Sequence, residues 1–351
     1  MTKQTSTVDQ LLGTFQKDYG DKVGGFGLKV QDATRIPTGL FAFDLATGGG
    51  LPRGKCSIIY GPESSGKTSI ALKAIAVHQK LWPDLRCVFF DVENSFDVPW
   101  AQKIGVDTDA LLVLKPDYAE QIVNMVEGLL YAQDCGLVVI DSIAAMMTVF
   151  ESEADAEKAV PGGAGLACAK LAKKSTLALS GAAKEGHMPT LLYINQVRSS
   201  MAMMGDPETM PGGKSIRFQS ALTVRVFGKN VSDTKVSKVL PIRKEIRFVV
   251  KKWKVPLVAA SGKVEMVTIP HNGFEVGDTN DWNTLSTYLE KLGHLEKQKN
   301  GYRLFDQVYS RLKDVRETLD ANATWQVQVK AQVISELVDS GDGSPEELAD
   351  D

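Results

Sequence analysis

Long apolar runs, a leader-like beginning and paired cysteines are all missing from this sequence of 351 residues. No stretch of about 18 consecutive apolar residues occurs, so we expect no transmembrane helix. The first ten residues, MTKQTSTVDQ, contain no apolar segment, so we expect no secretory signal. The four cysteines form no CxxC pair, which argues against a four-cysteine zinc module and predicts reduced thiols in a cytoplasmic protein.

An excess of charge of one sign is also lacking, since 40 Lys and Arg stand against 43 Asp and Glu. The distribution is less even. Residues 198–254 hold 13 Lys or Arg and 4 Asp or Glu, whereas residues 331–351 hold 7 Asp or Glu and no Lys or Arg. This pattern is typical of an anion-binding surface with a competing acidic tail. It is equally typical of a mixed surface with an inert tail, so charge alone leaves both interpretations open.

Both ends of the chain differ from its middle. In residues 1–35, apolar side chains at helical spacing predict a short amphipathic helix, followed by a glycine-rich linker; these side chains are Val8, Leu11, Leu12, Phe15 and Tyr19. Such a helix must bury its apolar stripe on its own domain or on a neighbouring subunit. Residues 338–351 are too polar to fold, and we expect a disordered acidic tail there.

The middle of the chain, residues 36–279, alternates short apolar runs with helical stretches. Continuous apolar strands separated by helices predict an α/β fold with a mostly parallel central sheet. Four runs fit this pattern: SIIY (57–60), CVFFD (87–91), LVVID (137–141) and TLLYIN (190–195). Two later runs, ALTVRVF (221–227) and EIRFVV (245–250), alternate more and favour an added antiparallel edge. Residues 280–337 predict a small C-terminal module of mixed α/β type.

Two long segments interrupt this rhythm. They cover about residues 151–165 and 198–217, and neither has helical or strand periodicity. Loops longer than about 12–15 residues are uncommon in compact domains and are usually functional or disordered. Both follow strands that carry candidate site residues, so we interpret both as functional loops.

A phosphate-binding loop follows the run SIIY and precedes a helical stretch. It matches the pattern GxxxxGK[ST] in the strand–loop–helix context that this pattern requires. Its backbone N–H groups and the helix N-terminus would hold phosphate oxygens, Lys67 would reach the β- and γ-phosphates of ATP, and the Thr68 hydroxyl would bind Mg²⁺. The predicted nucleotide-binding residues are Gly61, Pro62, Glu63, Ser64, Ser65, Gly66, Lys67, Thr68 and Ser69.

Polar residues at the ends of neighbouring strands are candidates for the rest of the site. Asp141 ends LVVID and is a candidate Mg²⁺ ligand through water, although such an Asp is more often a cap. Glu93 follows CVFFD and is our candidate for orienting and deprotonating the attacking water; the alternative is a surface residue. Gln196 follows TLLYIN, where an amide could sense the γ-phosphate. Trp100 could stack on the adenine, or belong to the core.

Several motifs together resemble the RecA recombinase family. IPTGLFAFDLATGGGLPRGKCSIIYGPESSGKTS (36–69) is similar to the lead-in and phosphate loop of the family, and FFDVENSFDVPWAQKIGVD (89–107) to the block that carries its catalytic glutamate, here Glu93. LVVIDSIAAM (137–146), YINQVR (193–198) and GDPETMPGGKSIRF (205–218) resemble the Walker B block, the glutamine switch and the second DNA-binding loop. The resemblance runs from about Ile36 to Lys254.

The resemblance implies a RecA-type ATPase core that binds ATP and Mg²⁺ between successive subunits of a helical filament. The two loops would hold single-stranded DNA for pairing and strand exchange with homologous double-stranded DNA, and hydrolysis would release the product. Loader and single-strand-binding proteins are implied partners. The N-terminal helix would dock on the next subunit, and the acidic tail would be autoinhibitory. The second loop's implied DNA-binding residues are Arg198, Met204, Gly212, Gly213, Lys214 and Arg217.

This chain departs from the family pattern at three places. Met204 stands where the family usually has an aromatic residue in the second loop. The first loop matches poorly, so its DNA contacts are expected from Lys170, Lys173 and Lys174, which could equally form a solvated helix face. For the lysines that reach the neighbour's nucleotide, a length change leaves the choice open among Lys251, Lys252 and Lys254. Beyond Asn280 the resemblance is faint, which is more typical of a phage-encoded relative.

Two other functions compete with a recombinase. A ring helicase or clock-type ATPase of the same core would be expected to bring an extra N-terminal domain or a second core. A non-hydrolysing, ATP-switched scaffold would be favoured if Glu93 did not lie at the water and the basic loops faced solvent without a ligand.

Overall fold

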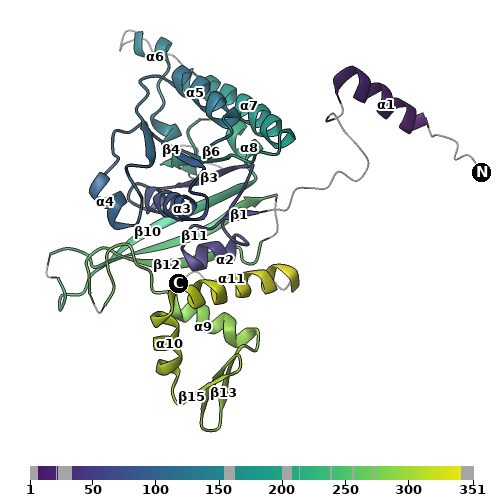
Figure 1. Ribbon diagram of the computed structural model, residues 1–351. Helices are drawn as coiled ribbons and strands as arrows, with labels where there is room; N and C mark the ends of the chain where they lie inside the picture. The colour runs from purple at the N-terminus through teal and green to yellow at the C-terminus, as the bar shows by residue number, and fades with distance from the viewer. Residues whose placement is uncertain are drawn as a thin grey trace, which may run out of the picture.

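The computed structural model describes residues 7–20, 22, 34–153, 163–199, 208–212, 214–237, 239–254, 257–271 and 273–340. Its main body is an α/β domain with a smaller module below it (Figure 1). Within the described residues, the largest sheet has eight strands in the order β12-β11-β10-β3-β7-β6-β4-β5. The fold class expected from the sequence is therefore confirmed.

Five strands of this sheet are parallel to one another and alternate with helices. They are β3 (Cys56–Gly61), β4 (Arg86–Asp91), β5 (Leu111–Leu114), β6 (Cys135–Asp141) and β7 (Thr190–Gln196). The edge beyond β3 is formed by β10 (Leu222–Val231), β11 (Arg243–Trp253) and β12 (Ser261–Val267). β10 runs parallel to β3, and only β11 and β12 bring antiparallel pairing. The expected antiparallel edge therefore starts one strand later than the sequence indicated.

Helices cover both faces of the sheet, as continuous apolar strands require. On one face, α2 (Phe41–Ala46), α3 (Lys67–Leu81) and α4 (Val98–Lys103) join one buried cluster; on the other, α5 (Ala119–Tyr131), α7 (Gly163–Lys184) and α8 (Lys214–Gln219) join a second. Shorter elements are β1 (Arg35–Ile36), β2 (Leu51–Pro52), the 3-10 turn Ile143–Ala145, α6 (Val149–Glu153), β8 (Arg198–Ser199) and β9 (Glu208–Thr209). In the described part of the chain, no helix has both the length and the apolar character needed to cross a bilayer.

The smaller module has its own apolar core. It contains α9 (Trp282–Lys291), β13 (Leu295–Gln298), β14 (Gly301–Leu304), β15 (Gln307–Tyr309), α10 (Leu312–Ala321) and α11 (Ala323–Ser340). Its buried residues pack against Phe41 and Leu45 of α2, which joins it to the main domain. Helix α11 continues through Ser340, three residues beyond the expected end of the module. Residues 341–351 lie outside the described residues.

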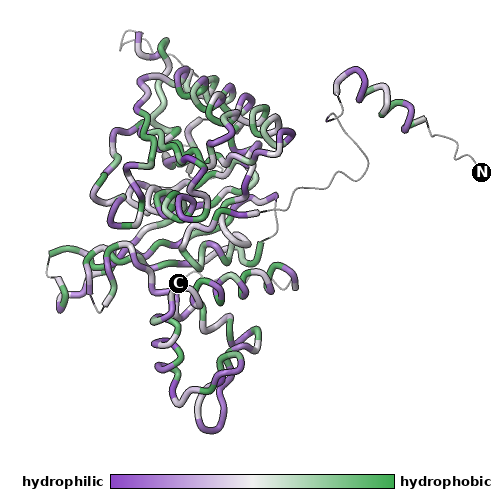
Figure 2. The backbone as a smooth tube through the Cα atoms, viewed as in Figure 1, coloured by the Kyte–Doolittle hydropathy of each residue, from purple (hydrophilic) through white to green (hydrophobic). Residues whose placement is uncertain are grey.

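The N-terminal helix, α1 (Thr7–Tyr19), stands apart from the main body (Figure 1). Figure 2 shows hydrophobic and hydrophilic segments alternating along this helix. Four residues of its apolar stripe are exposed: Val8 at 60%, Leu11 at 49%, Phe15 at 46% and Tyr19 at 73%. The predicted amphipathic helix is confirmed, but its stripe is not buried on its own domain. Burial on a neighbouring subunit, the other surface considered from the sequence, stays a prediction.

A buried carboxylate fixes the entry to the main domain. Asp44 on α2 is 5% exposed and accepts hydrogen bonds from the Thr38 backbone N–H (2.8 Å), the Thr38 hydroxyl (2.7 Å) and the Gly39 N–H (3.0 Å). Burial raises the pKa of Asp44 to about 7 despite these donors. The group is therefore protonated in the folded protein under conditions where it is ionised in the unfolded chain.

This shift predicts a pH dependence of stability. The unfolded pKa of an aspartate is about 4, so between about pH 4 and the folded value the native state holds one more proton than the unfolded state. The contribution of Asp44 to the free energy of unfolding is then greatest below this window and falls as the pH rises through it. Urea unfolding at a series of pH values should give a smaller downward slope for Asp44→Asn than for the wild type.

The exposed Asp84 provides the control, since Asp84→Asn should keep the wild-type slope. Parallel stability curves for wild type and Asp44→Asn would contradict the assignment.

Candidate nucleotide site

Four of the parallel strands end at the same edge of the sheet. The register pairs Gly61 of β3 with Gln196 of β7, and Asp91 of β4 with Asp141 of β6. In open α/β sheets, ligands bind outside the carboxyl ends of the strands. The predicted site residues at these ends are therefore brought together by the topology.

The phosphate loop connects β3 to α3 and packs tightly against β10 and β11. Gly66 precedes α3 with a φ of 97°, and a Cβ there would lie 2.7 Å from Ile246 Cδ1 of β11. A Cβ on Gly61 would lie 2.1 Å from the Val226 carbonyl oxygen. Gly66 is thus favoured by its backbone conformation and Gly61 by its contact with a backbone carbonyl, and the loop packs on β10 and β11.

Lys67 is folded back into this loop. It is 7% exposed, and its Nζ donates to the carbonyl oxygens of Gly61 (3.1 Å) and Pro62 (2.5 Å). Burial lowers the pKa of Lys67, while Asp141, Glu93 and Glu63 raise it. An ammonium held by backbone carbonyls at the start of a helix is suited to exchange those carbonyls for phosphate oxygens.

Thr68 and Asp141 meet where the sequence predicted a metal site. The Thr68 hydroxyl donates to Asp141 Oδ2 at 2.5 Å, and Asp141 is 4% exposed. Burial raises the pKa of Asp141 to about 6, the Thr68 hydrogen bond lowers it, and Glu93 raises it further. Oxygen ligands of this kind fit Mg²⁺, and two of them next to a phosphate loop match the usual arrangement in P-loop proteins.

Glu93 follows β4 and contacts residues at the ends of two other strands, β6 and β7. Its Oε1 accepts a hydrogen bond from Gln196 Nε2 at 2.8 Å and a second from the Ser142 hydroxyl. The sequence predicted Glu93 and Gln196 separately, and the structure brings them into contact. Ser142 was not assigned a role, although its position directly after Asp141 was a signal. A carboxylate held by two donors has a fixed orientation, which the predicted role in orienting water requires.

The end of β7 is also connected to the second loop. Asn195 is 2% exposed, its Oδ1 accepts the Gln196 backbone N–H at 3.0 Å, and its Nδ2 donates to the Pro211 carbonyl at 2.9 Å. Gln196, which contacts Glu93, is thus next in the chain to Asn195, which is hydrogen-bonded to Pro211.

Trp100 is half-buried on α4 and packs against the apolar cluster on that face of the sheet. Its backbone N–H donates to Asp97 Oδ1 at 2.9 Å, so Asp97 is the N-cap that begins the helix. The core role considered from the sequence is therefore present, and adenine stacking by the exposed part of the ring stays a prediction.

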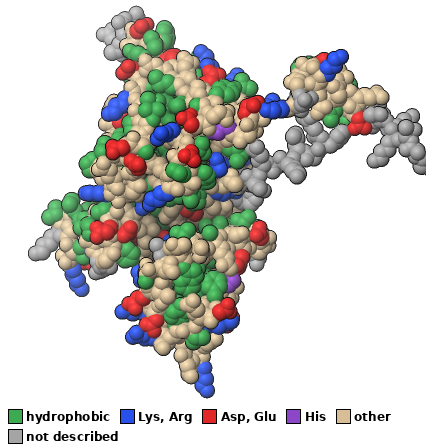
Figure 3. Space-filling view, viewed as in Figure 1, with side chains coloured by type: hydrophobic (Ala, Val, Ile, Leu, Met, Phe, Trp, Pro, Cys, Tyr) green, Lys and Arg blue, Asp and Glu red, His purple; other side chains and the backbone are tan. Residues whose placement is uncertain are grey.

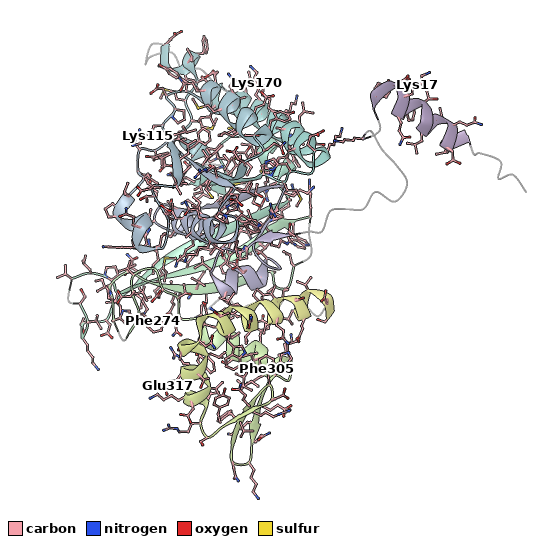
Figure 4. The ribbon with its side chains drawn as sticks, in the orientation of Figure 1. Lys17, Lys115, Lys170, Phe274, Phe305 and Glu317 are labelled. Carbon is pink, nitrogen blue, oxygen red and sulfur yellow. The ribbon has the colours of Figure 1, made fainter. Side chains whose placement is uncertain are left out.

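The three first-loop lysines do not share one environment. Lys170, labelled in Figure 4, and Lys173 are exposed on α7. Lys174 pairs with Glu127 of α5 at 2.6 Å and also donates to Asn124 at 3.3 Å. This contact connects α7 to α5, and DNA contact by the three lysines stays a prediction.

The second-loop residues are described only in part. Met204 and Gly213 lie outside the described residues, and of Arg198 and Lys214 only the backbone is described, in β8 and α8. Arg217 is exposed near the end of α8. Gly212 has a φ of 88°, and a Cβ there would lie 2.9 Å from Cys168 Sγ, so its close approach is to α7.

The candidate lysines for a neighbour's nucleotide contact α8 in this chain. Lys252 Nζ donates to the Arg217 carbonyl and to the Phe218 carbonyl at 2.8 Å. Lys254 Nζ donates to the same Phe218 oxygen at 3.3 Å, whereas Lys251 is exposed. Cations at a helix C-terminus stabilise its free carbonyl groups. Lys252 and Lys254 therefore cap α8, and a contact with a neighbouring nucleotide stays a prediction.

Surface charge does not mark the site by itself. In Figure 3, Lys and Arg are interspersed with Asp and Glu over the face in view.

A phosphate loop between a strand and a helix, with carboxylates and an amide at the next strand ends, defines a P-loop nucleotide-binding α/β protein. A model of the RecA N-terminal domain matches residues 6–268. The chain belongs to the RecA family.

Several relatives carry the name Protein RecA. The chain is 38% identical to that of Ruminococcus albus over 66% of this chain and 58% of the relative. It is 39% identical to that of Saccharopolyspora erythraea over 61% of each chain, and 38% identical to that of Bacillus licheniformis over 64% of each. The chain thus spans less than two thirds of the length of the relatives it matches. The resemblance noted in the sequence is confirmed at the level of the family.

Gly228 offers a test of the packing under the phosphate loop. A Cβ at this position of β10 would lie 2.6 Å from Ser65 Cα and 2.8 Å from the Ser64 carbonyl oxygen. Because both are backbone atoms, Gly228→Ala must displace the loop, and we expect affinity for ADP to fall by about tenfold or more. Titration with a fluorescent ADP analogue measures this.

Gly13→Ala on α1 is the matched control, because its Cβ would have nothing within 4 Å. Equal ADP affinity in Gly228→Ala and wild type would mean that β10 does not fix the loop.

Proposed function

We propose that this protein is an ATP-dependent DNA recombinase that forms helical filaments on single-stranded DNA and promotes pairing and strand exchange with homologous double-stranded DNA. The observation that carries the proposal is the contact of Glu93 with Gln196, at the strand end that leads into the second loop. It supports a nucleotide site that is physically joined to a DNA-binding segment. Family membership supports the same activity.

ATP is held in this proposal by the phosphate loop. The backbone N–H groups from Gly61 to Thr68 and the N-terminus of α3 bind the phosphates, and Lys67 leaves its carbonyl partners to reach the β- and γ-phosphates. Thr68 and Asp141 hold Mg²⁺, which neutralises charge on the phosphate oxygens. Trp100 stacks on the adenine.

Hydrolysis to ADP and phosphate is assigned to Glu93. Its carboxylate accepts a proton from the attacking water, and the two donors on Oε1 keep it oriented for that step. Gln196 shares its amide between Glu93 and the γ-phosphate. Loss of that phosphate changes the Gln196 contact, and the Asn195–Pro211 hydrogen bond passes the change to the second loop.

DNA binding is assigned to the two loops. In the second, Arg198, Lys214 and Arg217 meet backbone phosphates, Met204 packs against bases, and Gly212 and Gly213 keep the chain close to the strand. In the first, Lys170 and Lys173 supply positive charge from α7. Sequence preference should be weak, because phosphate and stacking contacts dominate single-strand binding.

Filament assembly is assigned to α1. Its exposed apolar stripe needs a partner surface, and a second copy of the chain offers one in a head-to-tail contact. Such a contact does not close on itself and gives an open helix. The nucleotide lies at the interface in this arrangement, with Lys251, Lys252 or Lys254 from the neighbour at its phosphates. Single-strand-binding and loader proteins are the expected partners, in the cytoplasm.

Glu93→Gln tests the hydrolytic part. An amide cannot accept the proton of the attacking water, so we expect kcat to fall by about 10²–10⁴-fold. Binding of ATP should change little, and filaments on single-stranded DNA should survive dilution longer, as seen by electron microscopy.

Glu317→Gln is the control, because Glu317 is an exposed partner of Lys313 in the C-terminal module. Wild-type turnover in Glu93→Gln would remove Glu93 from its role and favour a scaffold that only binds ATP.

A further inference from the structure

A third carboxylate lies at the sheet edge beside Glu93 and Asp141. Asp91 is the last residue of β4 and is 1% exposed. Its Oδ1 accepts the Ser95 backbone N–H at 2.8 Å, whereas its Oδ2 has no hydrogen-bond partner among the described residues. The proposed chemistry gives Asp91 no task.

Lys115 is the cation that faces this carboxylate. The register pairs Leu114, the last residue of β5, with Phe90 of β4. Lys115 and Asp91 each come one position later, so they are neighbours at the sheet edge. Lys115 Nζ lies 3.4 Å from Asp91 Oδ2, and the lysine side chain is 60% exposed. It is labelled at the flank of the main domain in Figure 4. Lys67 lies in the phosphate loop, where its Nζ donates to the carbonyls of Gly61 and Pro62.

Asp91 determines the shape of the turn that carries Glu93. Through the Ser95 N–H it closes residues 91–95 into a tight turn, and the Val92 N–H bonds to the Asp141 carbonyl at 2.8 Å. Asn94 in the same turn has a φ of 52°, a conformation that the surrounding contacts must hold. Glu93 is thus positioned by a turn that is anchored at both of its ends.

Removing Lys115 leaves a buried carboxylate beside two others. A buried charge without a partner is costly, and like charges close by add to that cost. The turn relieves this cost by moving Asp91 toward solvent, which gives up the Ser95 hydrogen bond. Glu93 moves with the turn and loses its alignment with Gln196 and Ser142.

We infer that Lys115 is a positioning residue for ATP hydrolysis: by neutralising Asp91, it holds the 91–95 turn in the shape that places Glu93 at the attacking water. This inference rests on the proposed function of Glu93. Lys115 acts through Asp91 and does not contact the nucleotide or DNA. Its removal should therefore affect the chemical step and leave binding intact.

The test is the ATPase activity of the full chain with saturating single-stranded DNA. We expect Lys115→Met to lower kcat by about tenfold, since small displacements of a catalytic group have effects of this size or larger. KM for ATP and affinity for single-stranded DNA should stay within about twofold of wild type. Lys115→Arg keeps the charge and should recover most of kcat.

A matched control is Lys313→Met, which removes the lysine of an exposed pair with Glu317 (3.2 Å) on α10. It should leave kcat unchanged. A second variant, Asp91→Asn, tests the same contact from its other side. Asp91→Asn removes the charge that Lys115 neutralises, so adding Lys115→Met to Asp91→Asn should cause no further loss of kcat.

Three outcomes would overturn the inference. An unchanged kcat in Lys115→Met would show that the turn does not need the ion pair. A raised KM or weaker DNA binding at constant kcat would make Lys115 a direct ligand contact. Equal losses from Lys115→Met in the wild-type and Asp91→Asn backgrounds would show that it does not act through Asp91. A wild-type protein without ATPase activity would instead refute the proposed function itself, and this inference with it.

Discussion

The structure depends most on one shared acceptor, the Oε1 atom of Glu93. It receives the Gln196 amide and the Ser142 hydroxyl, so the ends of β4, β6 and β7 converge on a single oxygen. Thr68 and Asp141 join the phosphate loop to the same edge. This convergence needs parallel strands, because only then do successive strands release their carboxyl ends at one side of the sheet.

Two sets of contacts connect the rest of the domain to the second loop. One passes through Asn195 to Pro211. The other runs from β11 to the end of α8, where Lys252 and Lys254 hold the carbonyl groups of Arg217 and Phe218. The segment assigned to DNA therefore lies between the end of β7, which belongs to the nucleotide site, and α8, whose C-terminal carbonyl groups are bound by two lysines. Such contacts give a physical basis for coupling nucleotide state to DNA binding.

The sequence predicted those features that short-range patterns determine. The phosphate loop follows from its spacing, and Asp141, Glu93 and Gln196 follow from polar residues at strand ends. Features that depend on packing between distant segments were missed. Strand β12 carries a weak pattern, whereas the short apolar run of β5, LLVL, was overlooked although it is continuous. The pairs Lys174–Glu127 and Lys115–Asp91 join residues from different elements, and no local motif indicates either. The capping role of Lys252 becomes visible only once β11 and α8 are placed side by side.

The ATPase rate, measured with and without single-stranded DNA over a range of salt concentrations, tests whether the nucleotide site is coupled to DNA. We expect strong stimulation by DNA, which declines as salt rises because phosphate contacts release counterions. A rate that is the same with and without DNA at every salt concentration would contradict it. The phosphate site would then belong to a P-loop ATPase whose partner is not DNA.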